Sequence, residues 1–343
     1  MTSTCAVCGR SGRGDAHRAK EMMFGRRDSF TYLECPDCGS LTLAEVPSSL
    51  SDYYPSGYYS LVEREEADQS PASAAIRRSA MALMLRSRGS ARALVACGGA
   101  LGMRVEPWTR LLGGCGLDLR ARVLDVGCGD GHRLRTFRRF GFRHLTGTDA
   151  HLAREANDTG AIALSRQGMD EVEGVFDLIM FHHSFEHMAD PVGVLNAVHR
   201  LIAPSGLLLL RLPVAGSWAW RTYGVDWVQL DAPRHQFLYS AEGVGKLAAR
   251  TGFDLRRTVY DSSAFQFWGS ELYRRGTSLQ EAGSLDGSPP STLSRQQLEQ
   301  WEQQATELNA AGDGDQASFL FTRTAEAGPP PIGRRRGRLL ART

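Results

Sequence analysis

Residues 122–131 read Arg-Val-Leu-Asp-Val-Gly-Cys-Gly-Asp-Gly, a short apolar run with one acid, followed by glycines at Gly127, Gly129 and Gly131. An apolar run of this length that breaks into a glycine turn predicts a buried parallel strand, and a helix is expected to begin at about His132. Glycines let the backbone approach a ligand where a Cβ would collide, and the first N–H groups of the helix face the same crevice. The stretch therefore predicts an α/β, Rossmann-like nucleotide site.

Asp125 narrows the choice of nucleotide. Its carboxylate lies in the strand, two residues before the first glycine, where it would repel the pyrophosphate of a dinucleotide. The same carboxylate suits a cationic amino-acid ligand, which favours S-adenosylmethionine over NAD. A second predicted strand, residues 144–149, ends in Asp149, 18 residues after Gly131. A carboxylate at that place can accept hydrogen bonds from both ribose hydroxyls.

The run resembles the first motif of the class I S-adenosylmethionine-dependent methyltransferases, and the segments that follow resemble that family in order and spacing. The segment 182–191, His-His-Ser-Phe-Glu-His-Met-Ala-Asp-Pro, is similar to a Glu-His-x-x-Asp-Pro stretch common in the family. The expected elements are strands at 176–181, 207–212, 252–259 and 317–324, the last antiparallel, helices at 192–202 and 242–250, and a turn at 204–206. The resemblance implies a seven-stranded, mostly parallel sheet.

The same resemblance implies which residues hold the cofactor. S-adenosylmethionine is expected to bind at the carboxyl ends of the first, second and fourth strands. The residues expected to contact it are Asp125, Gly127, Gly129, Gly131, Asp149 and His182.

Four cysteines form two knuckles, Cys5-Ala-Val-Cys8-Gly and Cys35-Pro-Asp-Cys38-Gly. Two such pairs supply four thiolates to a tetrahedral ion, and the glycine after each pair allows a sharp turn. The 26-residue gap is long for a zinc ribbon, and a hairpin of 21–24 with 29–33 would fold it back. Because four thiolates leave no open position, we expect a structural zinc. Two disulfides or redox-active pairs are the alternatives; a reducing cytosol and the lack of a thioredoxin-like pattern disfavour them.

Composition and the predicted elements indicate how the chain is divided into regions. We expect a zinc ribbon at 1–45, a helical connecting or cap region at 46–120, the methyltransferase domain at 121–275 and 315–326, a polar linker and helix at 276–314, and a disordered basic tail at 327–343. Helices are expected at 72–88, 91–112 and 293–310. The tyrosine-rich segment 52–59 is either a partly buried aromatic turn or a wall of the acceptor pocket. The aromatic-rich segment 217–240 is expected to cover the acceptor.

Charge and hydropathy argue against some partners. A net charge of +2 over 343 residues provides no field that would attract nucleic acid. No apolar stretch approaches the ~20 residues of a membrane span, and the first residues lack the apolar core of a signal peptide. We therefore expect a cytoplasmic enzyme with a small-molecule acceptor, and the oligomeric state stays open.

Histidines are the candidate general bases. The knuckles, the Tyr-Tyr-Pro segment and the stretch around Arg234-His235 resemble zinc-containing bacterial sugar C-methyltransferases, in which a Glu-His pair is the base. The resemblance implies His235 as base, but Arg234 replaces the glutamate. This replacement favours O-methylation, because a histidine alone suffices to deprotonate a hydroxyl.

A second segment holds further candidates. His183, Glu186 and His187 lie where the chain resembles the ubiquinone-pathway O-methyltransferases, whose Glu-His pair adjoins the acceptor. For each histidine the alternative is a buried ring satisfied by a backbone carbonyl.

The sequence therefore favours O-methylation of a sugar or other small secondary-metabolite hydroxyl, with His235 as base and His187 second. A deoxysugar C-methyltransferase built on the same residues is the first alternative. An rRNA guanine N-methyltransferase is another, and the near-neutral charge counts against it. A non-catalytic, zinc-dependent scaffold is the last, and the intact acids and glycines of the cofactor motifs count against that.

Overall fold

The structure is a computed structural model that describes residues 3–12, 14–55, 71–89, 106–152, 156–158 and 162–324. Three expected features therefore fall wholly or mostly outside the described residues. They are the second half of the tyrosine-rich segment 52–59, most of the expected helix at 91–112, and the basic tail at 327–343.

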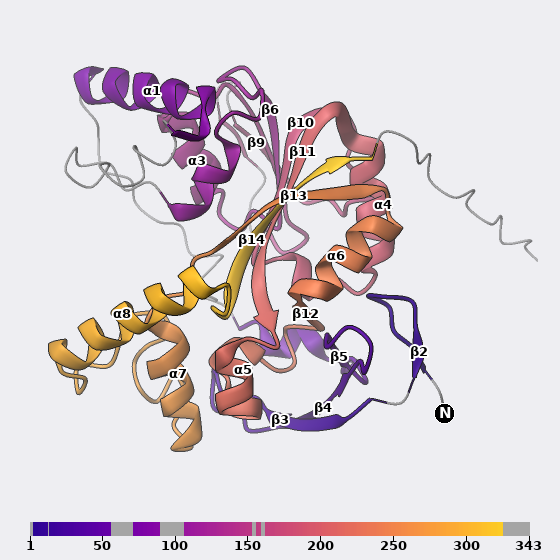
Figure 1. Cartoon of the computed structure of the whole chain (residues 1–343), viewed down its shortest axis with the longest axis vertical. Coiled ribbons are helices and arrows are strands. Elements are labelled where there is room, and N and C mark those ends of the chain that lie inside the picture. Colours follow the sequence, from indigo (N-terminus) through magenta and orange to yellow (C-terminus); the bar gives the residue numbers. More distant parts are fainter. Residues whose placement is uncertain are drawn as a thin grey trace, which may run out of the picture.

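A mostly parallel sheet forms the centre of the molecule (Figure 1). Its strands are β6 (Arg122–Val126), β7 (His144–Thr148), β8 (Ala156–Asp158), β9 (Ile162–Ser165), β10 (Phe176–His182), β11 (Ile202–Ala215), β13 (Phe253–Tyr260) and β14 (Gln316–Arg323). The spatial order is β13-β14-β11-β10-β6-β7-β9, with β14 antiparallel to both neighbours and β8 antiparallel to β9. This confirms the expected seven-stranded sheet with one antiparallel strand.

The helices are α1 (Pro71–Arg86), α3 (His132–Arg139), α4 (Pro191–Leu201), α5 (Trp218–Tyr223), α6 (Ala241–Arg250), α7 (Phe265–Arg274) and α8 (Arg295–Ala311). Helices α4 and α6 pack on one face of the sheet and α1 and α3 on the other. Helix α5 packs with Tyr32 and Leu41, and α7 packs with Met22 and Met23. The 3-10 turns are η1 (Leu50–Tyr53), η3 (Pro107–Leu112), η4 (Phe185–His187), η5 (Gly224–Asp226) and η6 (Val228–Leu230).

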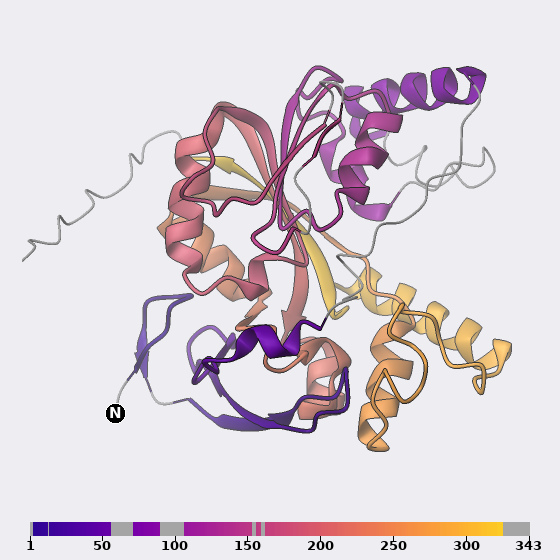
Figure 2. The same cartoon turned by 180° about the vertical axis from the view of Figure 1, so that it is seen from behind.

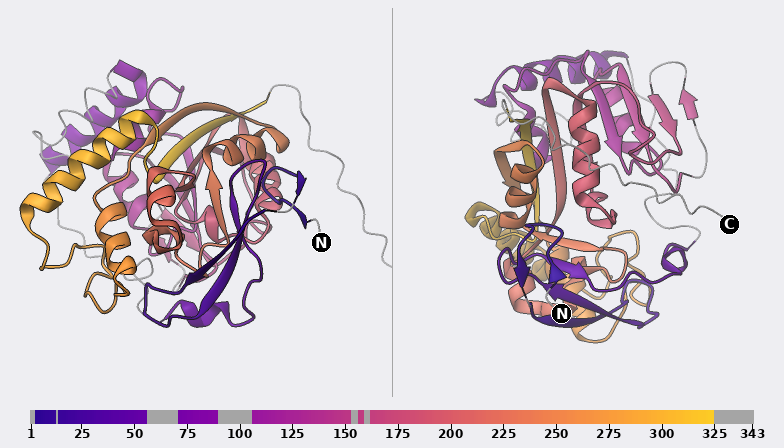
Figure 3. Two further views of the ribbon diagram at one scale, coloured as in Figure 1. Left: turned by 60° about the horizontal axis from the view of Figure 1, so that its bottom comes forward. Right: turned by 90° about the vertical axis from the view of Figure 1, so that its right-hand side faces the viewer.

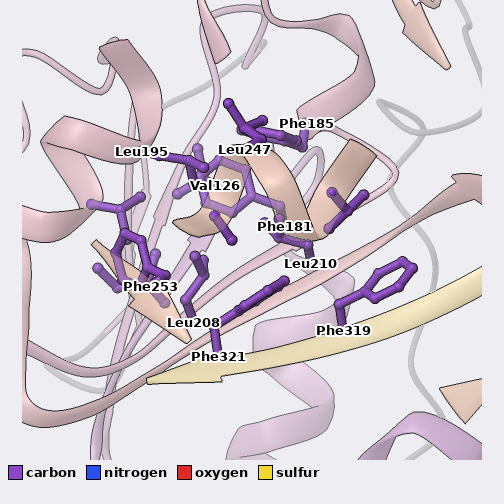
Figure 4. Packing of buried hydrophobic residues seen from close by; sticks show 14 of the residues in the cluster. Val126, Phe181, Phe185, Leu195, Leu208, Leu210, Leu247, Phe253, Phe319 and Phe321 are labelled. Carbon is purple, nitrogen blue, oxygen red and sulfur yellow. The ribbon is translucent and has the colours of Figure 1, made fainter. Parts of the chain in front are cut away.

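The alternation of side chains along the strands divides the core in two. Leu124 and Ile179 pack with residues of α4 and α6, while their neighbours Val123 and Leu178 pack with residues of α1, α3 and η3. This is the period of two expected for strands buried on both faces. Figure 4 shows the first cluster, with Leu195 of α4 and Leu247 of α6 against Leu208 and Leu210 of β11.

Three N-terminal strands extend the central sheet. These are β3 (Ala16–Lys20), β4 (Ser29–Glu34) and β5 (Leu41–Leu43), with β12 (Phe237–Ser240) next to them, while β1 (Ser3–Thr4) and β2 (Ser11–Gly12) pair with each other in a separate two-stranded sheet. The β3-β4-β5 meander pairs through β5 with β12, which pairs in parallel with the last residues of β11. Figures 2 and 3 show these strands at the end of the molecule where β11 ends. The meander therefore lies beside the carboxyl ends of the parallel strands.

Three sequence expectations about local structure need correction. The first hairpin strand is 16–20, not 21–24, because the Glu21 carboxylate accepts hydrogen bonds from the N–H groups of Phe24 (3.0 Å) and Arg26 (2.9 Å) and holds 21–28 as a loop. The turn at 204–206 lies inside β11 as a bulge, since the register passes from Phe176↔Ile202 to Leu178↔Leu207. Segment 217–240 is not only a loop, because its last four residues form β12.

No helix in the described parts of the chain is long and apolar enough to cross a membrane.

Candidate active site

A cavity of about 880 Å³ opens at the carboxyl ends of β6, β7 and β10. This is the position at which doubly wound sheets bind ligands, and the volume suits a nucleotide-sized molecule. Its walls include Asp125, Gly127, Asp149, His182, His183 and His187.

The glycine turn cannot carry larger residues. Gly127 has φ +72°, and a Cβ there would lie 2.3 Å from the Cβ of Ser184. Gly131 has φ +81°, and its Cβ would lie 2.9 Å from Leu164 Cδ1. Ser184 is itself fixed, because its hydroxyl donates to the Val126 carbonyl at 2.6 Å. Because Gly127 and Gly131 have no side chains, the turn packs closely against Ser184 and Leu164 without a steric clash.

The two acids of the cofactor motifs differ in their surroundings. Asp125 is 2% exposed, and its Oδ1 has no hydrogen-bond partner among the described residues. Burial, with a smaller contribution from Asp149, raises the pKa of Asp125 to about 7, although Arg133 opposes the shift. Asp149 accepts from the N–H groups of Gly129 (3.0 Å) and His151 (2.8 Å), which fixes its carboxylate at the edge of the cavity.

These two acids fit S-adenosylmethionine. An orphaned, buried carboxylate oxygen is stabilised by a cationic partner such as an amino-acid ammonium. A carboxylate held by two backbone N–H groups keeps lone pairs for a pair of hydroxyls.

His182 and His183 end strand β10 in different environments. His182 is buried against Trp108, with the ring centroids 4.6 Å apart, and burial holds its pKa well below the usual range. Neither of its ring nitrogens has a hydrogen-bond partner within the described residues. His183 has φ +51°, and its Nε2 lies 3.0 Å from an Nη of Arg211. Arginine only donates, so Nε2 of His183 accepts and Nδ1 carries the proton.

The structure brings Glu186, His187 and His235 together, from segments about 50 residues apart. One ligand-type atom of each lies within 4.8 Å of the others. His235 Nε2 is 3.9 Å from Glu186 Oε1, and the two imidazole centroids are 4.7 Å apart. Burial opposes ionisation of Glu186, but His183, His235 and His187 more than offset it and lower the pKa of Glu186 to about 2.

Backbone carbonyls set the tautomers of both histidines. His187 Nδ1 lies 2.9 Å from the Arg234 carbonyl, and His235 Nδ1 lies 2.8 Å from the Gln229 carbonyl. A carbonyl only accepts, so each Nδ1 carries the proton and each Nε2 presents a lone pair. Burial, helped by His235, lowers the pKa of His187 to about 4, so this ring is neutral at pH 7.

Arg234 has a structural position. Its side chain is fully buried and donates to Glu21 (2.9 Å), to both oxygens of Asp231, and to the Tyr53 carbonyl (3.1 Å). It thereby joins the N-terminal loop to the segment that carries His235. The carboxylate beside His235 comes from Glu186, which sequence comparison at position 234 does not reveal.

Of the two described tyrosines in segment 52–59, one fits the interpretation as a buried aromatic turn and the other fits the interpretation as a wall of the pocket. Tyr53 is buried, and its hydroxyl donates to Asp28 Oδ2 at 2.8 Å. Tyr54 lines the cavity, stacks on His151 with centroids 5.6 Å apart, and places its hydroxyl 3.1 Å from His187 Nδ1. Sequence reasoning missed this contact, because it depends on packing between 54 and 187.

The four knuckle cysteines converge as expected. Cys5 and Cys38 sulfurs are 3.9 Å apart, Cys8 and Cys35 sulfurs are 3.6 Å apart, and all four lie within 4.8 Å of one another. A tetrahedral zinc bound at about 2.3 Å by each sulfur would place the sulfurs about 3.8 Å apart. The donor set and its spacing therefore fit one zinc ion with a closed coordination sphere.

The knuckles pack against the two ends of α6. The hydroxyl of Ser240, the N-cap residue, donates to the Cys38 carbonyl, and Arg250, the last residue of α6, donates to the Val7 carbonyl at 2.8 Å. Both contacts use backbone carbonyls within a knuckle, so the knuckles and α6 stabilise one another.

Comparison with known proteins identifies the central region. Residues 103–258 match the model of a methyltransferase domain family. A ubiquinone biosynthesis O-methyltransferase of Maricaulis maris (strain MCS10) is 31% identical over 134 residues, which cover 34% of this chain and 51% of that protein. One from Caulobacter sp. (strain K31) is 33% identical over 100 residues, covering 26% and 39%. The chain thus spans about half, or less, of the length of these curated relatives.

Solved structures with a similar chain trace include a sarcosine dimethylglycine methyltransferase from Galdieria sulphuraria, with a TM-score of 0.39, 16% identity, and coverage of 68% of this chain and 86% of that one. The O-methyltransferase of a polyketide multienzyme from Brevibacillus brevis, in complex with S-adenosyl-L-homocysteine, has a TM-score of 0.37 at 12% identity, covering 60% and 67%.

Proposed function

Because residues 103–258 form a domain of the class I S-adenosylmethionine-dependent methyltransferase family, we propose that the protein methylates a hydroxyl of a sugar or other small secondary metabolite. The observation that carries this proposal is the presence within one cavity of a buried carboxylate oxygen without a hydrogen-bond partner among the described residues, at the glycine turn, and of the neutral imidazole of His187 in η4. When bound, S-adenosylmethionine supplies an electrophilic methyl group on sulfur.

We assign the cofactor contacts to Asp125, Gly127, Gly129, Gly131, Asp149 and His182. Asp125 holds the ammonium, Asp149 accepts from the ribose hydroxyls, and the glycine backbone lies against the amino-acid portion. The missing hydrogen-bond partner of Asp125 and the two backbone donors that hold Asp149 support these roles.

The acceptor hydroxyl gives its proton to an imidazole as its oxygen bonds to the methyl carbon, and the S–C electron pair stays on sulfur. Sequence comparison favours His235 as this base, with His187 second. The position of His187 on the cavity wall supports the reverse order, with His187 Nε2 accepting the proton and His235 next to it. Glu186, whose Oε1 lies 3.9 Å from His235 Nε2, then stabilises the imidazolium that forms, and His183 lies 3.4 Å from the same oxygen.

Zinc belongs to the proposal as a structural ion at Cys5, Cys8, Cys35 and Cys38. The ion supplies folding energy to a region with few buried apolar residues of its own. A zinc site of four thiolates requires that the cysteines stay reduced, which is consistent with a reducing compartment such as the cytoplasm.

C-methylation of a deoxysugar is a second candidate, favoured by one observation. Abstraction of a carbon-bound proton benefits from a carboxylate beside the imidazole, and Glu186 Oε1 lies 3.9 Å from His235 Nε2. The position of an isotope label in the product distinguishes O-methylation from C-methylation, since only C-methylation replaces a carbon-bound hydrogen of the acceptor with the methyl group.

Calorimetry with S-adenosylmethionine, followed by mass spectrometry of acceptors incubated with cofactor and protein, tests the proposal. Asp149→Ala should weaken cofactor binding by about 1.5–3 kcal/mol per lost charge-assisted hydrogen bond. Asp177→Asn is the matched control, because Asp177 pairs with Arg122 at the opposite end of the strands. Undiminished affinity in Asp149→Ala, or no methylated product from any sugar or polyketide hydroxyl, would overturn the assignment.

A further inference from the structure

The cluster of Glu186, His187 and His235 brings together more nitrogen and oxygen atoms that can bind a metal ion than a general base requires. One ligand-type atom from each residue lies within 4.8 Å of the other two. We propose that these three side chains bind a divalent transition-metal ion of the zinc class, distinct from the ion of the cysteine knuckles, at the acceptor end of the cavity.

The two histidines are oriented as metal ligands are. Each donates Nδ1–H to a backbone carbonyl, His187 to Arg234 at 2.9 Å and His235 to Gln229 at 2.8 Å. Metal-binding histidines almost always donate their other ring N–H in this way, which fixes the tautomer and aims the free lone pair. Each ring therefore keeps a free Nε2 lone pair.

The carboxylate supplies the third ligand. Glu186 is 0% exposed, and neither of its oxygens has a hydrogen-bond partner among the described residues. The protonated Nδ1 of His183 lies 3.4 Å from Oε1, which is not a hydrogen bond, and Oε2 has no hydrogen-bond partner within the described residues either. A buried carboxylate with unmet lone pairs is destabilising unless a cation is bound to it.

Asp231 is the other carboxylate near this point. Its Oδ2 lies 3.9 Å from His235 Nε2, but its charge is balanced by Arg234, whose Nε donates to both of its oxygens at 2.9 and 3.1 Å. Asp231 therefore has a resident cation, whereas Glu186 faces only imidazoles.

The donor set selects the class of metal. Two imidazole nitrogens and one carboxylate oxygen suit Zn²⁺, Co²⁺ or Fe²⁺, whereas Mg²⁺ and Ca²⁺ prefer oxygen ligands. Three protein ligands leave at least one open position, as in catalytic rather than structural sites. Of the three residues, His187 lines the cavity and so connects the proposed ion with the space for the acceptor.

This inference rests on the proposed function for its role. A hydroxyl bound to such an ion has a lowered pKa and loses its proton to solvent more easily. In that case His187 and His235 act as ligands and cannot also accept the proton. Whether the reaction depends on a second metal ion therefore distinguishes the role of these histidines as metal ligands from their role as general base.

Metal stoichiometry of the full-length chain tests the site. We expect Zn²⁺ or Co²⁺ titration to reveal two sites per chain, one removed by Cys35→Ser and the other by His235→Ala or Glu186→Gln. Each of the latter two variants should weaken the second site at least tenfold. His199→Gln is the control, because His199 is a buried histidine on α4 that packs on Phe253. Mg²⁺ should give no binding signal at the second site.

Absorption spectra of bound cobalt provide a further measurement, one that reports on the metal ligands and not on folding alone. The second site should show visible absorption without a thiolate-to-cobalt charge-transfer band, and Cys35→Ser should retain that absorption. Binding of only one ion, at the cysteines, by the wild-type chain would overturn the proposal. So would two-site binding in folded His235→Ala and His187→Ala, with thermal unfolding confirming that each variant is folded.

The same samples separate this proposal from the proposed function. Methyl transfer at full rate by a chain that holds one zinc refutes the second site and retains the function. Two bound ions with no methyl transfer to any tested acceptor refute the function and retain the site.

Discussion

The two walls of the cavity are built in different ways. On the proposed cofactor wall, five of the six assigned residues come from one continuous stretch, 122–149, in which a strand, a glycine turn, a helix and a second strand follow one another, and His182 at the end of β10 is the sixth. The proposed acceptor wall combines Tyr54, His187 of η4 and Gln236, and the buried Glu21 supports it from outside the cavity. The first wall is therefore mostly local in sequence, whereas the second depends on contacts between segments up to about 200 residues apart.

This difference assigns separate roles to the charges on each side. On the proposed cofactor wall, Asp125 is buried, and its Oδ1 has no hydrogen-bond partner in the part of the chain that the structure describes. On the acceptor wall, Arg234 is buried with Glu21 and Asp231 already bound to it. We expect changes on the first wall to alter ligand binding, and changes behind the second wall to alter stability as well as turnover.

The largest effect is expected for the imidazole on the acceptor wall. His187→Asn should lower kcat by ~10²–10⁴ while cofactor affinity stays near that of the wild type, because a positioned base or metal ligand is lost. His235→Asn should lower kcat by at least about tenfold. Steady-state kinetics with the true acceptor, alongside calorimetry with S-adenosylmethionine, measures both. Unchanged turnover in both variants would make these histidines structural.

Arg234→Met tests the long-range support of the acceptor wall. Removing one partner of a buried ion pair leaves Glu21 charged and unpaired, which costs about 3–5 kcal/mol of unfolding free energy. Urea unfolding measures this. Arg221→Met is the matched control, because Arg221 pairs with Asp313 at the surface, where such a pair contributes about 0–1 kcal/mol. A loss below about 1 kcal/mol for Arg234→Met would show that the wall does not depend on this contact.

Cys35→Ser tests how far the knuckles support the acceptor side. Loss of the metal should increase hydrogen exchange in residues 3–43, while strands β6 and β10 stay protected. Because β5 pairs with β12, the increase should also reach Phe237–Ser240, next to His235. Exchange measured by mass spectrometry provides the map. Equal loss of protection in β6 would mean that the two regions unfold together.

The pH dependence of cofactor binding tests the cofactor wall alone. Burial raises the pKa of Asp125 to about 7, so the carboxylate takes up a proton as the pH falls through 7 and loses its attraction for an ammonium. Affinity for S-adenosylmethionine should therefore decrease below pH 7, by up to about tenfold per pH unit. Asp125→Asn should bind more weakly with a flat profile, and Asp177→Asn should keep the wild-type profile. A flat wild-type profile between pH 5.5 and 8 would contradict the role of Asp125.

The local sequence was sufficient to predict those features that residues close together in the chain determine. The strand and glycine turn at 122–131, the acid at 149, and the two cysteine knuckles each lie within one short segment, and the strand order followed from the resemblance that these segments carry. Their conformations depend on backbone freedom at glycine and on side-chain periodicity, which are visible in one chain.

Only the tertiary structure decided the acceptor wall. β12 has four buried residues without alternation, so nothing in its sequence distinguishes it from a loop until β5 and β11 provide its hydrogen bonds. Likewise, the carboxylate beside His235 comes from Glu186, and Arg234 is paired with Glu21. Charges and ladder partners that meet across such separations are selected by packing of the folded chain, and a single sequence contains no periodicity that links them.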